Sequence, residues 1–213
     1  MNLSSISLYS LIAGFFMKKI VIASNNAGKI AEFKALFTPL GIETLSLKEA
    51  GIISDPEETG LTFIENALIK ARNAAKISGL PTLADDSGLV VPHLNGEPGI
   101  YSARYSDEAT DAANNAKLLE KMQFLTENQR AAYFKAVLVL IRHEKDPVPL
   151  IAEGEVNGFI TPNIQGSGGF GYDPLFYFPD KSQTFGELSS EEKNEISHRA
   201  IALKKLSTKL NDL

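Results

Sequence analysis

The chain has 213 residues, 44% hydrophobic and 22% charged, which is enough apolar material for one globular domain or two closely joined lobes. Its 21 basic and 26 acidic residues give a net charge of -5, so the composition does not supply the broad positive surface of a duplex-binding protein, and we expect no nucleic-acid partner. The absence of cysteine excludes disulfides, cysteine zinc sites and thiol catalysis, and the three histidines lack paired metal-ligand spacing, so a metal ion would need oxygen ligands.

Residues 1–16, MNLSSISLYSLIAGFF, are rich in serine and apolar side chains. They lack the basic start of a signal peptide and are too short to span a membrane. We expect either that Met17 is the natural start or that residues 1–16 are a loosely held extension. With no export signal, we expect a cytoplasmic protein without a membrane partner.

Residues 18–24, KKIVIAS, form a β-branched apolar run that predicts a short buried strand. The apolar period then becomes helical, and Pro39 with Gly41 ends the predicted helix. Its apolar positions are Ile30, Phe33, Phe37 and Leu40. N–H groups at the helix start, the positive end of the helix dipole and Lys29 predict a site for an anion, most simply a phosphate. The junction departs from a Walker A loop at two positions, and a capped helix with a solvated lysine is the competing interpretation.

A second strand is predicted at 42–47, followed by a polar loop. Thr62 and Glu65 then stand in capping-box relation and open a helix that Gly79 and Pro81 close. Its predicted apolar face consists of Ile64, Leu68, Ala71 and Ala75.

Residues 82–91, TLADDSGLVV, predict a strand that an acidic pair, Asp85 and Asp86, interrupts. Neighbours on a strand point to opposite faces, so we expect one carboxylate to face a site and the other to cap or pair, rather than a dyad that shares a proton. Glu57 and Glu58 precede the long helix and can add carboxylates, although a solvated turn is favoured for Glu57.

The second half continues with a helix at about 111–123, a strong strand at 131–144 and a hairpin partner at 149–160. A glycine-rich loop then leads into an aromatic strand within 163–179, and residues 191–210 are mostly helical. We find no internal repeat, and no linker long enough to separate independent domains.

The loop GSGGFGYDP contains four glycines, which allow close backbone approach to a ligand. Phe170 and Tyr172 can stack on a nucleobase or lie in the core, and the sequence favours neither; Asp173 can simply initiate a turn before Pro174.

Further along, Ser197 is a plausible N-cap with His198 and Arg199 in the first helical turn, where cations oppose the dipole. A bound anion would relieve this arrangement, and Lys193 can join the two; a surface basic pair is the competing interpretation.

Six motifs occur in order: ASNNAGKIAEF, EETGLTFIENALIKAR, LADDSGLVV, PGIYSARYS, GGFGYDPLF and EEKNEISHRA. From about Met17 to the C-terminus, the chain closely resembles the inosine/xanthosine triphosphate pyrophosphatases, a family that removes noncanonical purine nucleoside triphosphates. The resemblance implies an elongated, two-lobed α/β fold with a long central mixed β-sheet flanked by helices, an active-site cleft between the lobes, a single catalytic domain over 17–213, a homodimer and a requirement for Mg²⁺.

The reaction implied is hydrolysis of ITP, dITP or XTP to the monophosphate and pyrophosphate, which keeps deaminated purines out of DNA and RNA. The resemblance assigns catalysis and metal binding to Asp86, and places Glu58 near the metal. It assigns phosphate binding to Ser24, Asn25, Asn26, Ala27, Gly28 and Lys29, base binding to Phe170, Gly171, Tyr172 and Asp173, and other substrate contacts to Ser87, Lys193, His198 and Arg199. Asn25, where many relatives have glycine, is a mild variation.

Two other functions stay open at this point. One is a related pyrophosphatase acting on pyrimidine nucleotides, which turnover of ITP and XTP against dTTP and UTP would distinguish. The other is a nucleotide-binding regulator without catalysis, which the presence of Asp86, Glu58 and Lys29 disfavours.

Overall fold

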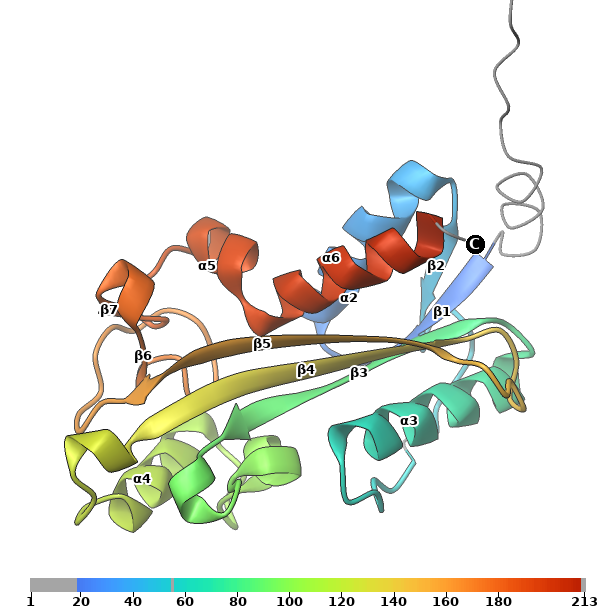
Figure 1. Ribbon diagram of the computed structural model, residues 1–213. Coiled ribbons are helices and arrows are strands. Elements are labelled where there is room, and N and C mark those ends of the chain that lie inside the picture. The colour runs from blue at the N-terminus through green and yellow to red at the C-terminus, as the bar shows by residue number, and fades with distance from the viewer. Residues whose placement is uncertain (1–18, 55, 212–213) are drawn as a thin grey trace, which may run out of the picture. The chain divides into compact units, whose positions relative to one another are not determined.

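The computed structural model in Figure 1 describes residues 19–54 and 56–211. The expectations for residues 1–16 and for a start at Met17 lie outside the described residues. The chain divides into two compact units. Of the described residues, unit 1 contains 19–54, 56–86, 137–152 and 202–211, and unit 2 contains 87–136 and 153–201.

Within the described ranges, seven strands form a mixed sheet in the order β2-β1-β3-β4-β5-β6-β7. Strand β1 pairs in parallel with β2 and β3, whereas β6 pairs antiparallel with β5 and β7. The strands are β1 Lys19–Ala23, β2 Glu43–Ser46, β3 Thr82–Val90, β4 Ala131–Ile141, β5 Leu150–Ile160, β6 Phe176–Phe178 and β7 Gln183–Thr184. Together with the flanking helices, this confirms the predicted α/β class and mixed sheet.

In unit 1, helices α2 (Ala27–Phe37) and α3 (Phe63–Ser78) lie on opposite faces of the sheet (Figure 1). Because helices cover both faces, β1 is apolar nearly throughout, as is usual for parallel strands. Helix α3 packs small side chains on the sheet; its buried residues are Asn66, Ala67, Ala71, Ala74 and Ala75. Of the predicted face, Ile64 and Leu68 are only partly buried.

Helix ends in unit 1 follow the predicted capping chemistry. Asn26 caps α2, and the chain leaves the helix through a 3₁₀ turn, Thr38–Leu40, into Gly41 at φ 69°. Thr62 caps α3, which ends at Gly79 with φ 68°. A left-handed residue after a helix is a common stop, and glycine adopts it without strain.

The predicted interruption of the third strand is wrong. Strand β3 runs without a break through Asp85 and Asp86, and both residues are buried. Strand β4 is also shorter than predicted and ends at Ile141. There the Asp146 carboxylate accepts hydrogen bonds from the Arg142 backbone at 2.9 Å and from its guanidinium, which turns the chain.

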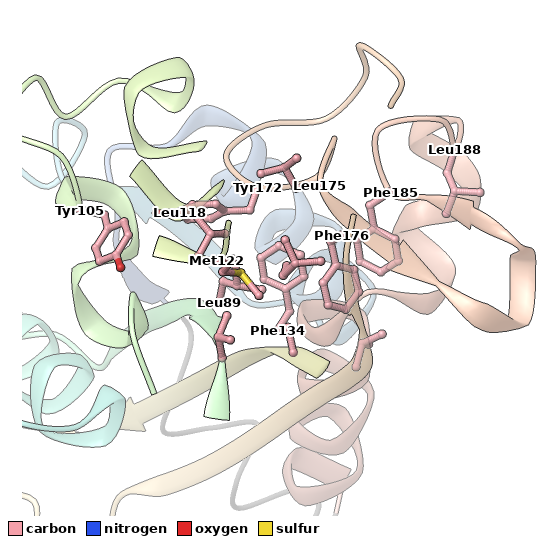
Figure 2. Close-up of a cluster of buried hydrophobic side chains, with 14 residues drawn as sticks. Leu89, Tyr105, Leu118, Met122, Phe134, Tyr172, Leu175, Phe176, Phe185 and Leu188 are labelled. Carbon is pink, nitrogen blue, oxygen red and sulfur yellow. The ribbon is translucent and has the colours of Figure 1, made fainter. Parts of the chain in front are cut away.

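Unit 2 is built around aromatic packing. Phe134 of β4, Phe176 of β6 and Phe185 form a cluster with ring centroids 4.6 to 5.9 Å apart, and Leu118 and Met122 pack into it from α4 (Figure 2). The helices of unit 2 are α4 Asp111–Lys121 and α5 Ser190–Ile196, with 3₁₀ turns at Pro92–Leu94, Gly99–Arg104, Glu127–Gln129 and Pro179–Lys181. Helix α6 His198–Asn211 begins in unit 2 and continues in unit 1 from Ala202. None of the helices in the described residues is long and apolar enough to cross a membrane.

Candidate active site

The junction between β1 and α2 in unit 1 has the geometry that the sequence predicted. The Asn26 side chain accepts a hydrogen bond from the Lys29 backbone N–H at 3.0 Å, and the Asn26 N–H donates to Ser24 Oγ at 3.1 Å. Asn25, Ala27 and Gly28 are exposed. The first turn of α2 is therefore fixed by its own side chains and open to a ligand.

Lys29 is not the solvated lysine of the competing interpretation. Its Nζ lies 2.5 Å from Asp85 Oδ2, and the Asp85 side chain is fully buried. Asp85 therefore pairs with a cation, as was expected for one member of the acidic pair; Asp86 also pairs with a cation, which was not expected. This ion pair holds the ammonium group of Lys29 at the start of α2.

Asp86 makes an ion pair on the other face of β3. Lys70 Nζ, from α3, lies 2.7 Å from Asp86 Oδ1 and 3.1 Å from Glu58 Oε1. Strand alternation explains why Asp85 meets a lysine of α2 whereas Asp86 meets one of α3. The structure therefore brings the carboxylates of Glu58 and Asp86 to the same lysine, whereas Glu57 is exposed.

Lys70 was missed by the sequence analysis. A detectable signal was its position on α3, between Ala67, Ala71 and Ala74 on the apolar face. A lysine among small buried residues needs a carboxylate partner, because an unpaired buried charge is strongly destabilising.

Burial and neighbouring charges shift the pKa values of both Asp86 and Lys70. Burial raises the pKa of Asp86 above its ordinary value, and the charges of Glu58 and Asp85 act in the same direction while Lys70 opposes them. Burial alone would lower the pKa of Lys70, but Asp86 and Glu58 together raise it. A carboxylate with a raised pKa is a better proton acceptor near neutral pH than an exposed one.

The donor set fits a magnesium ion that is shared with a substrate. Asp86 Oδ2 is buried and has no hydrogen-bond partner among the described residues. No group of three or more His, Cys, Asp or Glu suited to a metal occurs in the described parts of the chain. Mg²⁺ commonly binds through one or two carboxylates, with phosphate and water completing its shell, and Asp86 with Glu58 matches that requirement.

In unit 2, Asp173 organises the glycine-rich loop. Its buried carboxylate accepts a hydrogen bond from the Phe170 N–H at 2.8 Å and forms an ion pair with Lys193. Gly169 has φ +74°, and a Cβ there would lie 2.1 Å from Asp173 Oδ2, so only glycine fits. Burial raises the pKa of Asp173, opposed by Lys193, the Phe170 N–H and Arg199. Asp173 therefore does more than initiate a turn.

The two aromatic residues of this loop, Phe170 and Tyr172, differ in their exposure to solvent. Phe170 is 52% exposed, and Lys193 Nζ lies 4.4 Å from its ring centroid. Tyr172 is buried in the core cluster, where its hydroxyl donates to the Ser102 carbonyl at 2.9 Å (Figure 2). Only Phe170 presents a ring surface that a nucleobase can reach. Stacking by Tyr172 is excluded, although its backbone stays in the predicted base-binding segment.

The start of α6 matches its prediction. Ser197 Oγ accepts a hydrogen bond from the Ala200 N–H at 3.2 Å and caps the helix. His198 and Arg199 are both buried, so the surface-pair interpretation is wrong. The His198 ring stacks on Phe134 at 4.9 Å and 12°, and the charge of Arg199 acts on the Asp173 carboxylate.

The predicted site residues thus divide between the two units, and in unit 1 the Lys29–Asp85 pair and the Glu58–Lys70–Asp86 cluster lie on opposite faces of β3. In unit 1 the predicted site residues are Ser24 to Lys29, Glu58 and Asp86, and in unit 2 they are Ser87, Phe170 to Asp173, Lys193, His198 and Arg199. Three residues that were not predicted also contact predicted site residues. Lys70 contacts Asp86, and both Asp111 and Asn115 contact Gly171.

The mixed sheet and its flanking helices define an α/β protein in which buried carboxylates pair with lysines among the predicted site residues. The model of the Ham1 family matches residues 20–209, so the chain belongs to the Ham1 family. It is 53% identical over 198 residues to a dITP/XTP pyrophosphatase of Xanthomonas campestris pv. campestris, covering 92% of this chain and 99% of that protein. It is 52% identical over 191 residues to the dITP/XTP pyrophosphatase of Escherichia coli strain K12, covering 89% and 96%.

Solved structures agree with the family assignment. A HAM1 protein from Coxiella burnetii superposes with a TM-score of 0.88 at 47% identity, covering 92% of this chain and all 100% of that one. The Ham1 protein of Staphylococcus aureus gives a TM-score of 0.85 at 44% identity, with coverages of 92% and 99%. These matches confirm the mixed α/β fold.

Proposed function

We propose that this chain hydrolyses noncanonical purine nucleoside triphosphates, namely dITP, ITP and XTP, to the monophosphate and pyrophosphate with Mg²⁺. The enzyme class, a pyrophosphatase that cleaves an acid anhydride, rests on relatives of 52–53% identity that are named dITP/XTP pyrophosphatase. The observation that carries the proposal is the Glu58–Lys70–Asp86 cluster, in which a buried carboxylate of raised pKa faces a second carboxylate and a cation. This arrangement suits a catalytic base beside a metal.

The phosphate chain is assigned to unit 1. The exposed start of α2 offers backbone N–H groups and the positive end of the helix dipole, and Lys29 adds a cation that Asp85 holds in place. A triphosphate is highly anionic while the chain has a net charge of -5, so local cations must compensate. In unit 2, Lys193 and Arg199 are the cations that the sequence predicted as further substrate contacts.

Asp86 and Glu58 are assigned to the metal. When bound, Mg²⁺ screens the phosphate oxygens and lowers the pKa of a coordinated water. The Asp86 carboxylate then accepts the proton of the water that attacks the α-phosphorus, and pyrophosphate leaves in line with the attack. Lys70 keeps the Asp86 carboxylate oriented and stabilises its ionised form.

The base is assigned to unit 2. Donors from the segment Phe170 to Asp173, and from His198 or Arg199, pair with the O6 atom of hypoxanthine or xanthine. A 6-amino group in that position leaves buried donors unpaired, a mismatch that reaches about 10⁴-fold in sites built for hydrogen bonding. The exposed ring of Phe170 supplies a stacking surface.

We also propose a homodimer and a cytoplasmic location, where nucleotide pools are replenished. In unit 2, Phe124 is 89% exposed, and a groove of 740 Å³ lined by its neighbours Gln123 and Leu125 combines apolar side chains such as Phe159 and Pro162 with polar ones such as Glu127 and Arg130. Exposed apolar surface of this kind is typical of association sites. Light scattering of the purified full chain tests the proposal, and a monomeric mass at micromolar concentration would refute it.

A triphosphate panel tests the activity. Purified protein with Mg²⁺ is incubated with dITP, XTP, ITP, ATP, GTP, dTTP and UTP, and pyrophosphate and orthophosphate are detected separately. We expect pyrophosphate from the first three at rates far above the others. Preference for dTTP and UTP would support the pyrimidine alternative, binding without turnover would support the regulator, and release of orthophosphate would exclude attack at the α-phosphorus.

A further inference from the structure

The first turns of helix α4 hold Gly171 of the glycine-rich loop through the two peptide groups that flank it. Asp111 Oδ2 accepts a hydrogen bond from the Gly171 N–H at 2.7 Å, and Asn115 Nδ2 donates to the Gly171 carbonyl at 2.9 Å. The spacing i, i+4 places both side chains on the same face of the helix. All three residues belong to unit 2. We refer to Asp111 and Asn115 as the α4 clamp.

The helix that carries the clamp is itself fixed. Thr110 caps α4 by accepting a hydrogen bond from the Ala113 N–H at 3.2 Å. Asn114 is buried and accepts bonds from the Ser106 N–H at 2.7 Å and the Ser106 hydroxyl at 2.8 Å. These bonds tie the start of α4 to the preceding segment, so the clamp presents its groups from a rigid support.

The loop needs such external support. Gly166, Gly169 and Gly171 all have positive φ, and a glycine-rich loop gains little conformational restriction from its own backbone. Gly171 lies directly after Phe170, whose N–H is bonded to Asp173, and directly before Tyr172, which is anchored in the core. A backbone rotation about Gly171 would therefore move the exposed Phe170 ring and disturb the hydrogen bond from the Phe170 N–H to Asp173.

We infer that Asp111 and Asn115 are positioning residues for base selection: by holding the two peptide groups on either side of Gly171, they fix the orientation of the segment Phe170 to Asp173 toward the 6-oxo purine. This inference rests on the function proposed above. It assigns no contact between the clamp and the substrate. Loss of the clamp should therefore weaken recognition of the base while leaving the phosphate and metal groups of unit 1 unchanged.

Isosteric substitutions separate positioning from simple loss of stability. Asp111→Asn keeps an oxygen that accepts from the Gly171 N–H, whereas Asp111→Ala removes it. Asn115→Asp keeps the shape but replaces a donor with an oxygen that repels the Gly171 carbonyl. Glu120→Ala, at an exposed position on the same helix, is the matched control. Because Asp111 is exposed, its variants are compatible with folding even where Asn115→Asp is not.

Two measurements test the inference: kcat and KM for dITP and dATP, and hydrogen–deuterium exchange of residues 166–173. For Asp111→Ala and Asn115→Asp we expect KM for dITP to rise about tenfold, kcat/KM for dATP to change little, and exchange in the loop to accelerate. Asp111→Asn and Glu120→Ala should match the wild type.

If Asp111→Ala leaves the ratio of kcat/KM for dITP to kcat/KM for dATP unchanged, the inference is overturned. A wild-type enzyme that releases no pyrophosphate from dITP would instead overturn the proposed function, and the inference with it. The two failures are therefore distinguishable in one experiment.

Discussion

At the scale of single residues, Asp86 is the group on which the proposed chemistry depends. Replacement by asparagine keeps the shape but removes the proton acceptor and one metal ligand. We expect Asp86→Asn to lower kcat by at least about 10³-fold, within the range typical of general-base removal. Binding of dITP, measured by calorimetry, should persist because the groups at the start of α2 remain.

The control for this substitution is Asp107→Asn, an exposed aspartate in the segment before α4. It should retain full pyrophosphate release. Turnover by Asp86→Asn at the wild-type rate would remove Asp86 from the catalytic role.

Lys70 allows a test of stability. Lys70→Met removes the cation that faces Glu58 and Asp86, so the carboxylates are left close together and partly buried. We expect a loss of about 1–3 kcal/mol in the free energy of unfolding at pH 7, less than for a fully buried pair because water reaches these side chains. Urea denaturation followed by circular dichroism measures it, with the exposed Lys76→Met of the same helix as control.

The pH dependence of that loss has a definite sign. Burial raises the pKa of Asp86 above its ordinary value of 3.8, and removal of Lys70 raises it further. A carboxyl group whose pKa is higher in the folded than in the unfolded state destabilises the fold as pH rises through that interval. The deficit of Lys70→Met should therefore shrink below about pH 4 and grow toward neutrality. A deficit that is constant with pH would contradict the electrostatic explanation.

The sequence revealed the residues whose partners are local or follow from strand alternation. Asp85 and Asp86 were expected on opposite faces of a strand, and they are. Asn26 and Ser197 were recognisable as caps because a cap depends only on the next few residues. Lys70 and the α4 clamp were not recognised, since their partners lie 16 and about 56–60 residues away in the chain.

At the scale of elements, we predict different effects of alanine at two glycines of the glycine-rich loop. Gly169 and Gly171 both have positive φ, so alanine is strained at either position. A Cβ at Gly169 would also collide with the Asp173 carboxylate, whereas one at Gly171 meets nothing within 4 Å. We expect Gly169→Ala to raise KM for dITP about tenfold or more and Gly171→Ala to have a much smaller effect.

Steady-state kinetics with dITP, together with thermal unfolding of each variant, measures the difference. If the two variants behave alike, the Asp173 carboxylate does not constrain the loop at Gly169. Equal backbone strain at the two positions makes Gly171→Ala the matched control.

The ends of helices could be predicted to within a few residues where the sequence places a glycine that can adopt the left-handed conformation. Gly41 and Gly79 end helices in the left-handed conformation that their sequence context indicated. The predicted break in β3 failed for a different reason. Two adjacent acidic residues read as a turn locally, but lysines from α2 and α3 neutralise them within a continuous strand, and sequence periodicity does not reveal such pairing.

At the scale of the whole molecule, each compact unit has its own hydrophobic cluster. The alanines of α3 and the valines of the central strands form one, and the aromatic side chains of unit 2 form the other (Figure 2). The class of fold was predictable because six motifs occur in order along one chain. The distribution of site residues over two units was not readable from periodicity.

We predict that removal of the metal ion stops catalysis but leaves the fold of the whole protein intact. The described residues contain no group of three or more His, Cys, Asp or Glu that could hold a metal, so Mg²⁺ should contribute to catalysis and substrate binding rather than to folding. We expect excess EDTA to abolish pyrophosphate release from dITP and added Mg²⁺ to restore it. The midpoint of thermal unfolding without nucleotide should stay unchanged. By contrast, dITP with Mg²⁺ at about 100 times its Kd should stabilise Asp86→Asn, which does not consume the nucleotide, by no more than about 2.7 kcal/mol. A large fall in the unfolding midpoint on chelation would show instead that a resident metal ion helps to hold the fold together.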